Sequence, residues 1–165
     1  MKQELTAERL RELLSYDMET GIFTRIVSRS GAGKVGSAVG NLKKHGYLNM
    51  MIDGKIYLAH RLAWLYVHGV WPTNHIDHKN GNRIENWIAN LRDVTRVVNR
   101  QNQRTPNRDS MTGFLGVTWN KRCKKFMAQI NSNGICTYLG LFKSAEDAHD
   151  AYLIAKRMQH VGCTI

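Results

Sequence analysis

The sequence predicts an α+β protein built from two small modules. Apolar residues at helical spacing alternate along the chain with short strand-like runs. Asp53-Gly54 and Asn133-Gly134 are dipeptides typical of tight hairpin turns. A polar stretch at residues 103–112 predicts a linker, and the sequence pattern after it differs from the pattern before it. A length of 165 residues suits one ordinary domain or two small ones.

The first module is expected to begin with a short amphipathic helix. Thr6 is a suitable N-cap, and leucines at positions 10, 13 and 14 lie on one helical face. Residues 16–24 predict a turn into a strand. Residues 28–46 are rich in Gly, Ser and Lys and predict a mobile basic loop.

A hairpin and an apolar helix follow. Residues 46–58 predict two strands that turn at Asp53-Gly54, and residues 59–68 predict a helix that ends at Gly69. The next segment predicts a strand, a polar loop, a second strand and a helix capped by Thr95, at residues 75–77, 79–90, 91–94 and from 96 onward.

The last fifty or so residues predict a three-stranded antiparallel sheet and one helix. Strands are expected at 116–119, 125–131 and 137–142. Alternation in the second strand turns Phe126, Ala128 and Ile130 toward a core. Ser144 caps a helix whose alanines would let it lie close to the sheet, at positions 145, 148, 151 and 155.

The charge of the chain favours a polyanionic partner. Lys and Arg number 24 against 13 acids, which gives a net charge of +11. Nucleic acid is the expected partner, and simple solubility is the alternative. No basic amphipathic helix points to a membrane surface, and no small-molecule substrate is expected. Three scattered cysteines do not favour a thiolate zinc site. With no apolar signal segment, we expect a cytoplasmic protein.

The segment from Asn74 to Asn99 carries the candidate chemistry. Asp77 and Asn99 offer oxygen ligands for a hard divalent cation, and His78 has a suitable intrinsic pKa to take a proton from water. Adjacent strand residues point to opposite faces, so Asp77 and His78 need a bend to meet at one site. His75 could replace Asp77 as a ligand, but we expect it to pack or to contact DNA instead.

These residues resemble the signature of HNH nucleases, in the subgroup that ends in Asn and occurs in phage and intron-encoded homing endonucleases. His78, Asn90 and Asn99 are spaced by 12 and then 9 residues, and the flanking segments 60–64, 69–72, 77–82 and 86–92 also match. The resemblance implies a ββα-metal fold. Asp77 and Asn99 would bind Mg²⁺ or Mn²⁺, His78 would be the general base, and Asn90 would brace the loop and orient His78.

Residues 113–160 resemble an AP2 domain, a family that lays a three-stranded sheet in the major groove of DNA. Cations would contact phosphates, while Gln and Asn would read base edges. Leu115, Thr118 and Tyr138 depart from the arginines and tryptophan common in that family. The expected DNA contacts are Trp119, Lys121, Arg122, Lys125, Gln129, Asn131 and Tyr138.

The sequence thus predicts a metal-dependent DNA endonuclease of homing type that acts on double-stranded DNA as a monomer or weak dimer. We expect a nuclease module at 1–102, a linker at 103–112 and a DNA-binding domain at 113–165. The alternative is a DNA-binding regulator or structural factor with an inactive HNH core. The target sequence and the choice between nicking and double-strand cleavage stay open.

Overall fold

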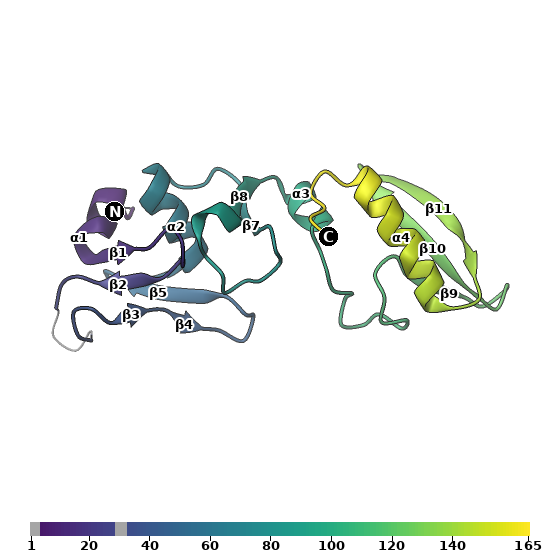
Figure 1. The fold of residues 1–165 in the computed structure, drawn as a ribbon, viewed down its shortest axis with the longest axis horizontal. Coiled ribbons are helices and arrows are strands. Elements are labelled where there is room, and N and C mark those ends of the chain that lie inside the picture. The colour runs from purple at the N-terminus through teal and green to yellow at the C-terminus, as the bar shows by residue number, and fades with distance from the viewer. Residues whose placement is uncertain (1–3, 29–32) are drawn as a thin grey trace. The chain divides into compact units, whose positions relative to one another are not determined.

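The computed structural model describes residues 4–28 and 33–165 and confirms the α+β prediction. Helices and small antiparallel sheets follow one another along the chain (Figure 1). The chain divides into two compact units, Met1–Val94 and Thr95–Ile165. The predicted functional division at residues 103–112 stays a prediction.

The first unit begins with α1 (Ala7–Leu13), capped by Thr6. The Thr6 hydroxyl oxygen accepts a hydrogen bond of 3.2 Å from the backbone N–H of Arg9, as expected for this cap. The first sheet has the order β1-β2-β3, with bounds Leu14–Tyr16, Phe23–Arg25 and Ala38–Val39.

A second sheet, β4-β5-β6, follows directly. Its strands are Asn41–Leu42, Leu48–Ile52 and Lys55–Leu58. The prediction of one loop over 28–46 is wrong where β3 and β4 form, because Ala38 and Asn41 pair with neighbouring strands; residues 29–32 lie outside the described part of the chain. Asp53 and Gly54 have φ of 47° and 78°, which confirms the predicted turn.

The core of the first unit forms where α2 (Ala59–His68) covers these elements. Gly69, with φ of 76°, ends the helix as predicted. Leucines from both helices pack with aromatic and methionine side chains from the strands, including Leu10, Phe23, Met50, Leu62 and Leu65. This apolar cluster also contains Ile76 and Leu91, so it supports the next hairpin.

That hairpin pairs β7 (His75–His78) with β8 (Leu91–Val94). Asp77 lies opposite Arg92, and His78 lies opposite Leu91. The connecting loop closes with a short 3-10 helix, η1 (Ile88–Asn90). The predicted strand–loop–strand is therefore confirmed, with β7 one residue longer than expected.

The second unit starts with α3 (Arg96–Gln101), whose predicted cap Thr95 accepts from the N–H of Val98. The sheet β11-β10-β9 follows, with bounds Ile135–Phe142, Lys125–Ser132 and Val117–Asn120. α4 (Ala145–Gln159) packs against this sheet (Figure 1), and Ala145, Ala148 and Ala155 are buried. The predicted three-stranded sheet with an alanine-faced helix is confirmed.

The segment between α3 and β9 is attached to the second unit. The Lys156 ammonium donates to the backbone oxygen of Gln103, and the Thr112 hydroxyl donates to the backbone oxygen of Val117 at 3.0 Å. At Gly116 a Cβ atom would lie 2.0 Å from the Tyr152 ring, so only glycine allows this approach. Both ends of the predicted linker are thus held by hydrogen bonds within the unit.

Candidate active site

His78 is the best-defined member of the site. It is buried at the end of β7, and its Nε2 lies 3.0 Å from Oδ1 of Asn86. The amide nitrogen of Asn86 donates to the backbone oxygen of Ile84, which places Oδ1 toward the ring. A carbonyl oxygen can only accept, so Nε2 carries the proton and Nδ1 carries the lone pair. In this tautomer Nδ1 is the nitrogen that can accept a proton.

The backbone of Asn86 is held by Tyr16 and by the close approach of Gly21. The Tyr16 hydroxyl donates to the backbone oxygen of Asn86 at 2.6 Å. The backbone at Gly21 approaches so closely that a Cβ would lie 2.4 Å from the carbonyl carbon of Asn86 and 2.3 Å from the nitrogen of Trp87. The turn before β2 therefore supports the partner of His78.

Asn90 braces the loop between β7 and β8. Its side-chain oxygen accepts from the N–H of Asn80 at 3.0 Å, and its nitrogen donates to Asn80 Oδ1 and to the backbone oxygen of Glu85. Glu85 in turn accepts from the side chains of Asn80 and Asn82 at 2.6 Å each. This matches the expected bracing role. The side chain bonded to His78 Nε2 is Asn86, not the predicted Asn90.

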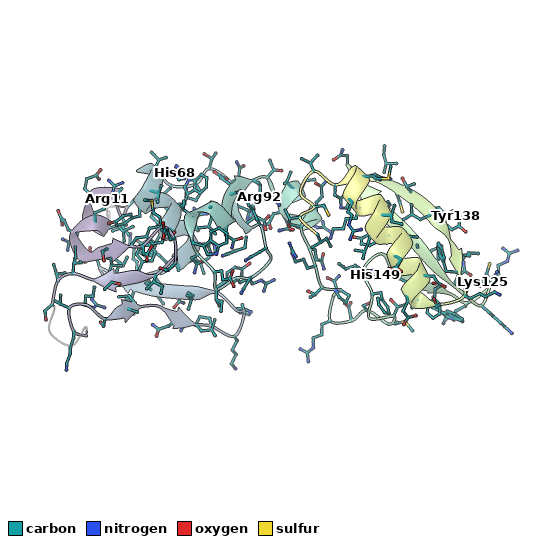
Figure 2. All side chains as sticks on the ribbon, viewed as in Figure 1. Arg11, His68, Arg92, Lys125, Tyr138 and His149 are labelled. Atoms are coloured by element: carbon teal, nitrogen blue, oxygen red, sulfur yellow. The ribbon has the colours of Figure 1, made fainter. Side chains whose placement is uncertain are left out.

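Asp77 is buried beside His78 but has a different neighbour. Arg92, labelled in Figure 2, lies opposite on β8 and donates from Nε and Nη2 to Asp77 Oδ2 at 2.9 and 2.8 Å. Asp77 and His78 are consecutive residues of β7, and the His78 ring also contacts Asn86. Asp77 still acts on His78 electrostatically, because its negative charge favours the protonated ring.

An aromatic cluster surrounds the His78 ring. His60 of α2 meets it edge to face with centroids 5.2 Å apart, and Tyr47 of the β4–β5 turn lies 5.2 Å from His60 and 6.1 Å from His78. Burial lowers the pKa of His60 to about 3. Burial also lowers the pKa of His78, while the bond to Asn86 and the charge of Asp77 oppose this shift. Both rings are therefore neutral near neutral pH.

Asp77 and Asn99 are the two predicted ligands of a divalent cation. Asp77 supplies a buried carboxylate, which matches the oxygen preference of Mg²⁺ and Mn²⁺. Within residues 4–28 and 33–165, no group of three His, Cys, Asp or Glu side chains could hold a metal. Asn99 lies half-buried on α3 in the second unit. Its role as a ligand stays a prediction.

Cross-strand register places Trp119 beside Phe126 in the second unit. Trp119 pairs with Phe126 and packs on its ring at 4.8 Å, on the face that also carries Ala128 under α4. Strand alternation from the buried Val117 turns Trp119 to the side of the sheet opposite Gln129, yet Trp119 is 43% exposed, so its role as a DNA contact stays a prediction. Thr118 lies on the open face with Gln129, beside Met127.

The other expected contacts lie on the open face or at its end. Gln129 pairs with Tyr138 and Asn131 with Cys136. Lys125 and Tyr138 come from the neighbouring strands β10 and β11 (Figure 2). The basic turn after β9 exposes Lys121 and Arg122. A groove of about 1240 Å³ is lined by residues of this face and of the preceding segment, including Gln129, Asn131, Cys136, Asn107, Asp109 and Met111.

Sequence reasoning missed three residues of the first site. Asn86 lies in one of the segments that resemble HNH nucleases, but no separate role was predicted for it. The signal that could have identified it is an Asn eight residues after the candidate base. Arg83 and Tyr47 were not singled out. Arg83 and Tyr47 are 36 positions apart in the sequence, so no local pattern could reveal their contact.

A protein-family model matches the segment that contains the first site. Residues 57–103 match the family model described as HNH endonuclease. This range covers α2, β7, η1, β8 and α3, so it contains Asp77, His78 and Asn90. The resemblance of this segment to HNH nucleases is confirmed.

Among solved structures, the chain is similar to one described as "DNA binding and cleavage by the HNH homing endonuclease I-HmuI". The two chains are 21% identical, the match covers 91% of this chain and 88% of that one, and the TM-score is 0.43. No curated protein matches the chain. In the described part of the chain, no helix is long and apolar enough to cross a membrane.

Proposed function

We propose that the protein is a metal-dependent DNA endonuclease of homing type. The observation that carries this proposal is the hydrogen bond from His78 Nε2 to Asn86, inside a segment that matches HNH endonucleases. It sets the lone pair on Nδ1 of a buried, neutral imidazole that follows the buried Asp77 in the sequence.

In the proposed reaction, His78 Nδ1 takes a proton from water. The water oxygen forms a bond to the scissile phosphorus, and the bond from phosphorus to the leaving sugar oxygen breaks. Asp77 would hold the divalent cation, which when bound would stabilise negative charge on the phosphate and the leaving oxygen. Asn99 stays the second ligand that the resemblance to HNH nucleases implies. Asn86 fixes the tautomer of His78, and Asn90 keeps the loop closed.

The second unit would position DNA in the manner of AP2-like sheets. Gln129, Asn131 and Tyr138 share the open face with Lys125, so base-edge contacts and a phosphate contact can come from one surface. Lys121 and Arg122 add exposed cations beside it. The net charge of +11 supports a polyanionic partner.

The test is a nicking assay on supercoiled plasmids that carry a library of inserts. Wild type is incubated with Mg²⁺ or with EDTA, beside His78→Ala and the matched control His68→Ala, which changes an exposed histidine at the end of α2. We expect Mg²⁺-dependent nicking by wild type and by the control, and at least about a 100-fold loss in His78→Ala. Binding without any nicking would support a DNA-binding regulator instead.

A further inference from the structure

The turn between β4 and β5 is fastened to the loop that follows β7. Arg83 donates from Nη1 to the backbone oxygen of His45 at 2.9 Å, and its guanidinium lies 4.9 Å from the centroid of the Tyr47 ring. Gly46 lies between these contacts, where a Cβ would stand 3.7 Å from Arg83 Cδ. One side chain of the nuclease loop thus holds both the backbone and the ring of this turn.

The same turn reaches the candidate general base. Tyr47 contacts His60, and His60 meets the His78 ring edge to face. His60 Nδ1 is buried and has no hydrogen-bond partner among the described residues, so that atom does not tie the ring to a polar neighbour. Ring packing therefore fixes His60 against Tyr47 and His78. A movement of the Tyr47 ring would therefore change the packing around the imidazoles of His60 and His78.

The outer side of the turn is basic and exposed. Lys43, Lys44 and His45 are all exposed, while the backbone closes through bonds from Lys43 N to Tyr47 O and from Gly46 N to Lys43 O, at 3.0 and 2.8 Å. A short rigid turn with two lysines suits the phosphates of a DNA backbone. The five-residue segment 43–47 thus carries exposed cations at Lys43 and Lys44 and a half-buried aromatic ring at Tyr47.

We propose that Arg83, Tyr47 and His60 form a latch through which DNA contact at Lys43–His45 sets the orientation of His78. Tyr47 and Arg83 are positioning residues, and Lys43 and Lys44 are contacts for the DNA backbone. The inference rests on the proposed function, since it assigns a partner to the same site. It predicts that loss of the Tyr47 ring disturbs His78 more than it weakens DNA binding.

The experiment compares Tyr47→Leu with Tyr47→Phe, which keeps the ring. Tyr57→Leu is the matched control, because it removes another half-buried tyrosine ring, one that stacks on Trp71. Imidazole ¹⁵N spectra are recorded in EDTA at pH 7.5, with and without a mixed-sequence 30-base-pair duplex, and the His78 signals are assigned by their loss in His78→Gln. We expect altered His78 signals in Tyr47→Leu only. Unchanged signals in Tyr47→Leu would overturn the latch.

Two further measurements separate binding from chemistry. In Mg²⁺, Tyr47→Leu and Arg83→Gln should nick about 10- to 100-fold more slowly than wild type, with little change in Kd. Joint replacement Lys43→Gln and Lys44→Gln should reduce the salt slope of duplex binding by about 2. A full salt slope in that variant would overturn the DNA contact. Wild type that never nicks would refute the proposed function, while the spectra and the salt slope would still decide the latch.

Discussion

The Nε2 atom of His78 lies 3.0 Å from the Oδ1 atom of Asn86, and both side chains are buried. This pair fixes which nitrogen of the candidate base carries the lone pair. It also links the base to the Tyr16–Gly21 turn, because that turn holds the backbone of Asn86. The orientation of His78 therefore depends on packing well outside the strand that carries it.

Replacing Asn86 should impair cleavage more than folding. Asn86→Ala removes the acceptor for Nε2–H, so the other tautomer becomes populated and Nδ1 loses its lone pair for part of the time. We expect the single-turnover nicking rate to fall about tenfold or more, in line with the size of general-base effects. Asn86→Asp keeps an acceptor and should retain the Nε2–H signal in ¹⁵N spectra. Equal nicking by Asn86→Ala and wild type would contradict the assigned role.

Gly21 should be intolerant of a side chain for two separate reasons. Its φ is 75°, and a Cβ would overlap the backbone of Asn86 and Trp87. Gly54 is a matched control, since its φ is 78° and a Cβ there meets nothing within 4 Å. Gly54→Ala should cost only the backbone strain, about 1–2 kcal/mol, and Gly21→Ala clearly more. Urea unfolding of both variants tests this, and equal losses would refute the close approach.

His60 should make the first unit sensitive to acid. Burial lowers its pKa from 6.5 to about 3 in the folded protein, so the unfolded chain binds a proton first as the pH falls. Stability from this group is present above pH 6.5 and is lost progressively toward pH 3. At pH 5 the loss is about 2 kcal/mol. His60→Phe keeps an aromatic ring without titration, so its free energy of unfolding should fall less between pH 7.5 and 5. Parallel urea curves for both proteins would count against this prediction.

Divalent cations should stabilise the protein through Asp77. Ligand binding to the folded state raises Tm by mass action, so Mg²⁺ or Mn²⁺ should raise the Tm of wild type in thermal scans without DNA. Asp77→Asn should abolish this increase. Arg92→Leu leaves a buried carboxylate without this partner and should lower stability by about 3 kcal/mol or more, yet it should keep the response to the cation. The same Tm increase in Asp77→Asn would exclude Asp77 as a ligand.

The open face of the C-terminal sheet should contribute more to DNA binding than Trp119. Tyr138→Ala and Gln129→Ala remove groups from that face, and each should weaken duplex binding by about 1–3 kcal/mol. Trp119→Phe, which keeps a ring against Phe126, should bind nearly as wild type does. Fluorescence anisotropy at fixed salt measures all three. A loss confined to Trp119→Phe would restore Trp119 as the DNA contact.

Local signals in the sequence predicted the elements well because their causes are local. Thr6, Thr95 and Ser144 cap helices through bonds to residues three positions on. Asn133 and Gly134 take φ of 52° and 85°, which few other residue pairs tolerate. The spacing of His78 and Asn90 likewise identified the HNH segment. These features depend on neighbours within a few residues or on a recognised pattern.

Only the tertiary structure decided which side chains meet. The sequence by itself determined the α+β class, the basic character and the position of the candidate base. Whether Asn86 or Asn90 bonds His78 depended on how the loop closes, and the face of Trp119 depended on strand register. Arg83 meets Tyr47 because the loop after β7 lies against the turn between β4 and β5. Such contacts depend on packing between residues that are distant in the sequence, and this packing produces no periodic pattern from which it could be predicted.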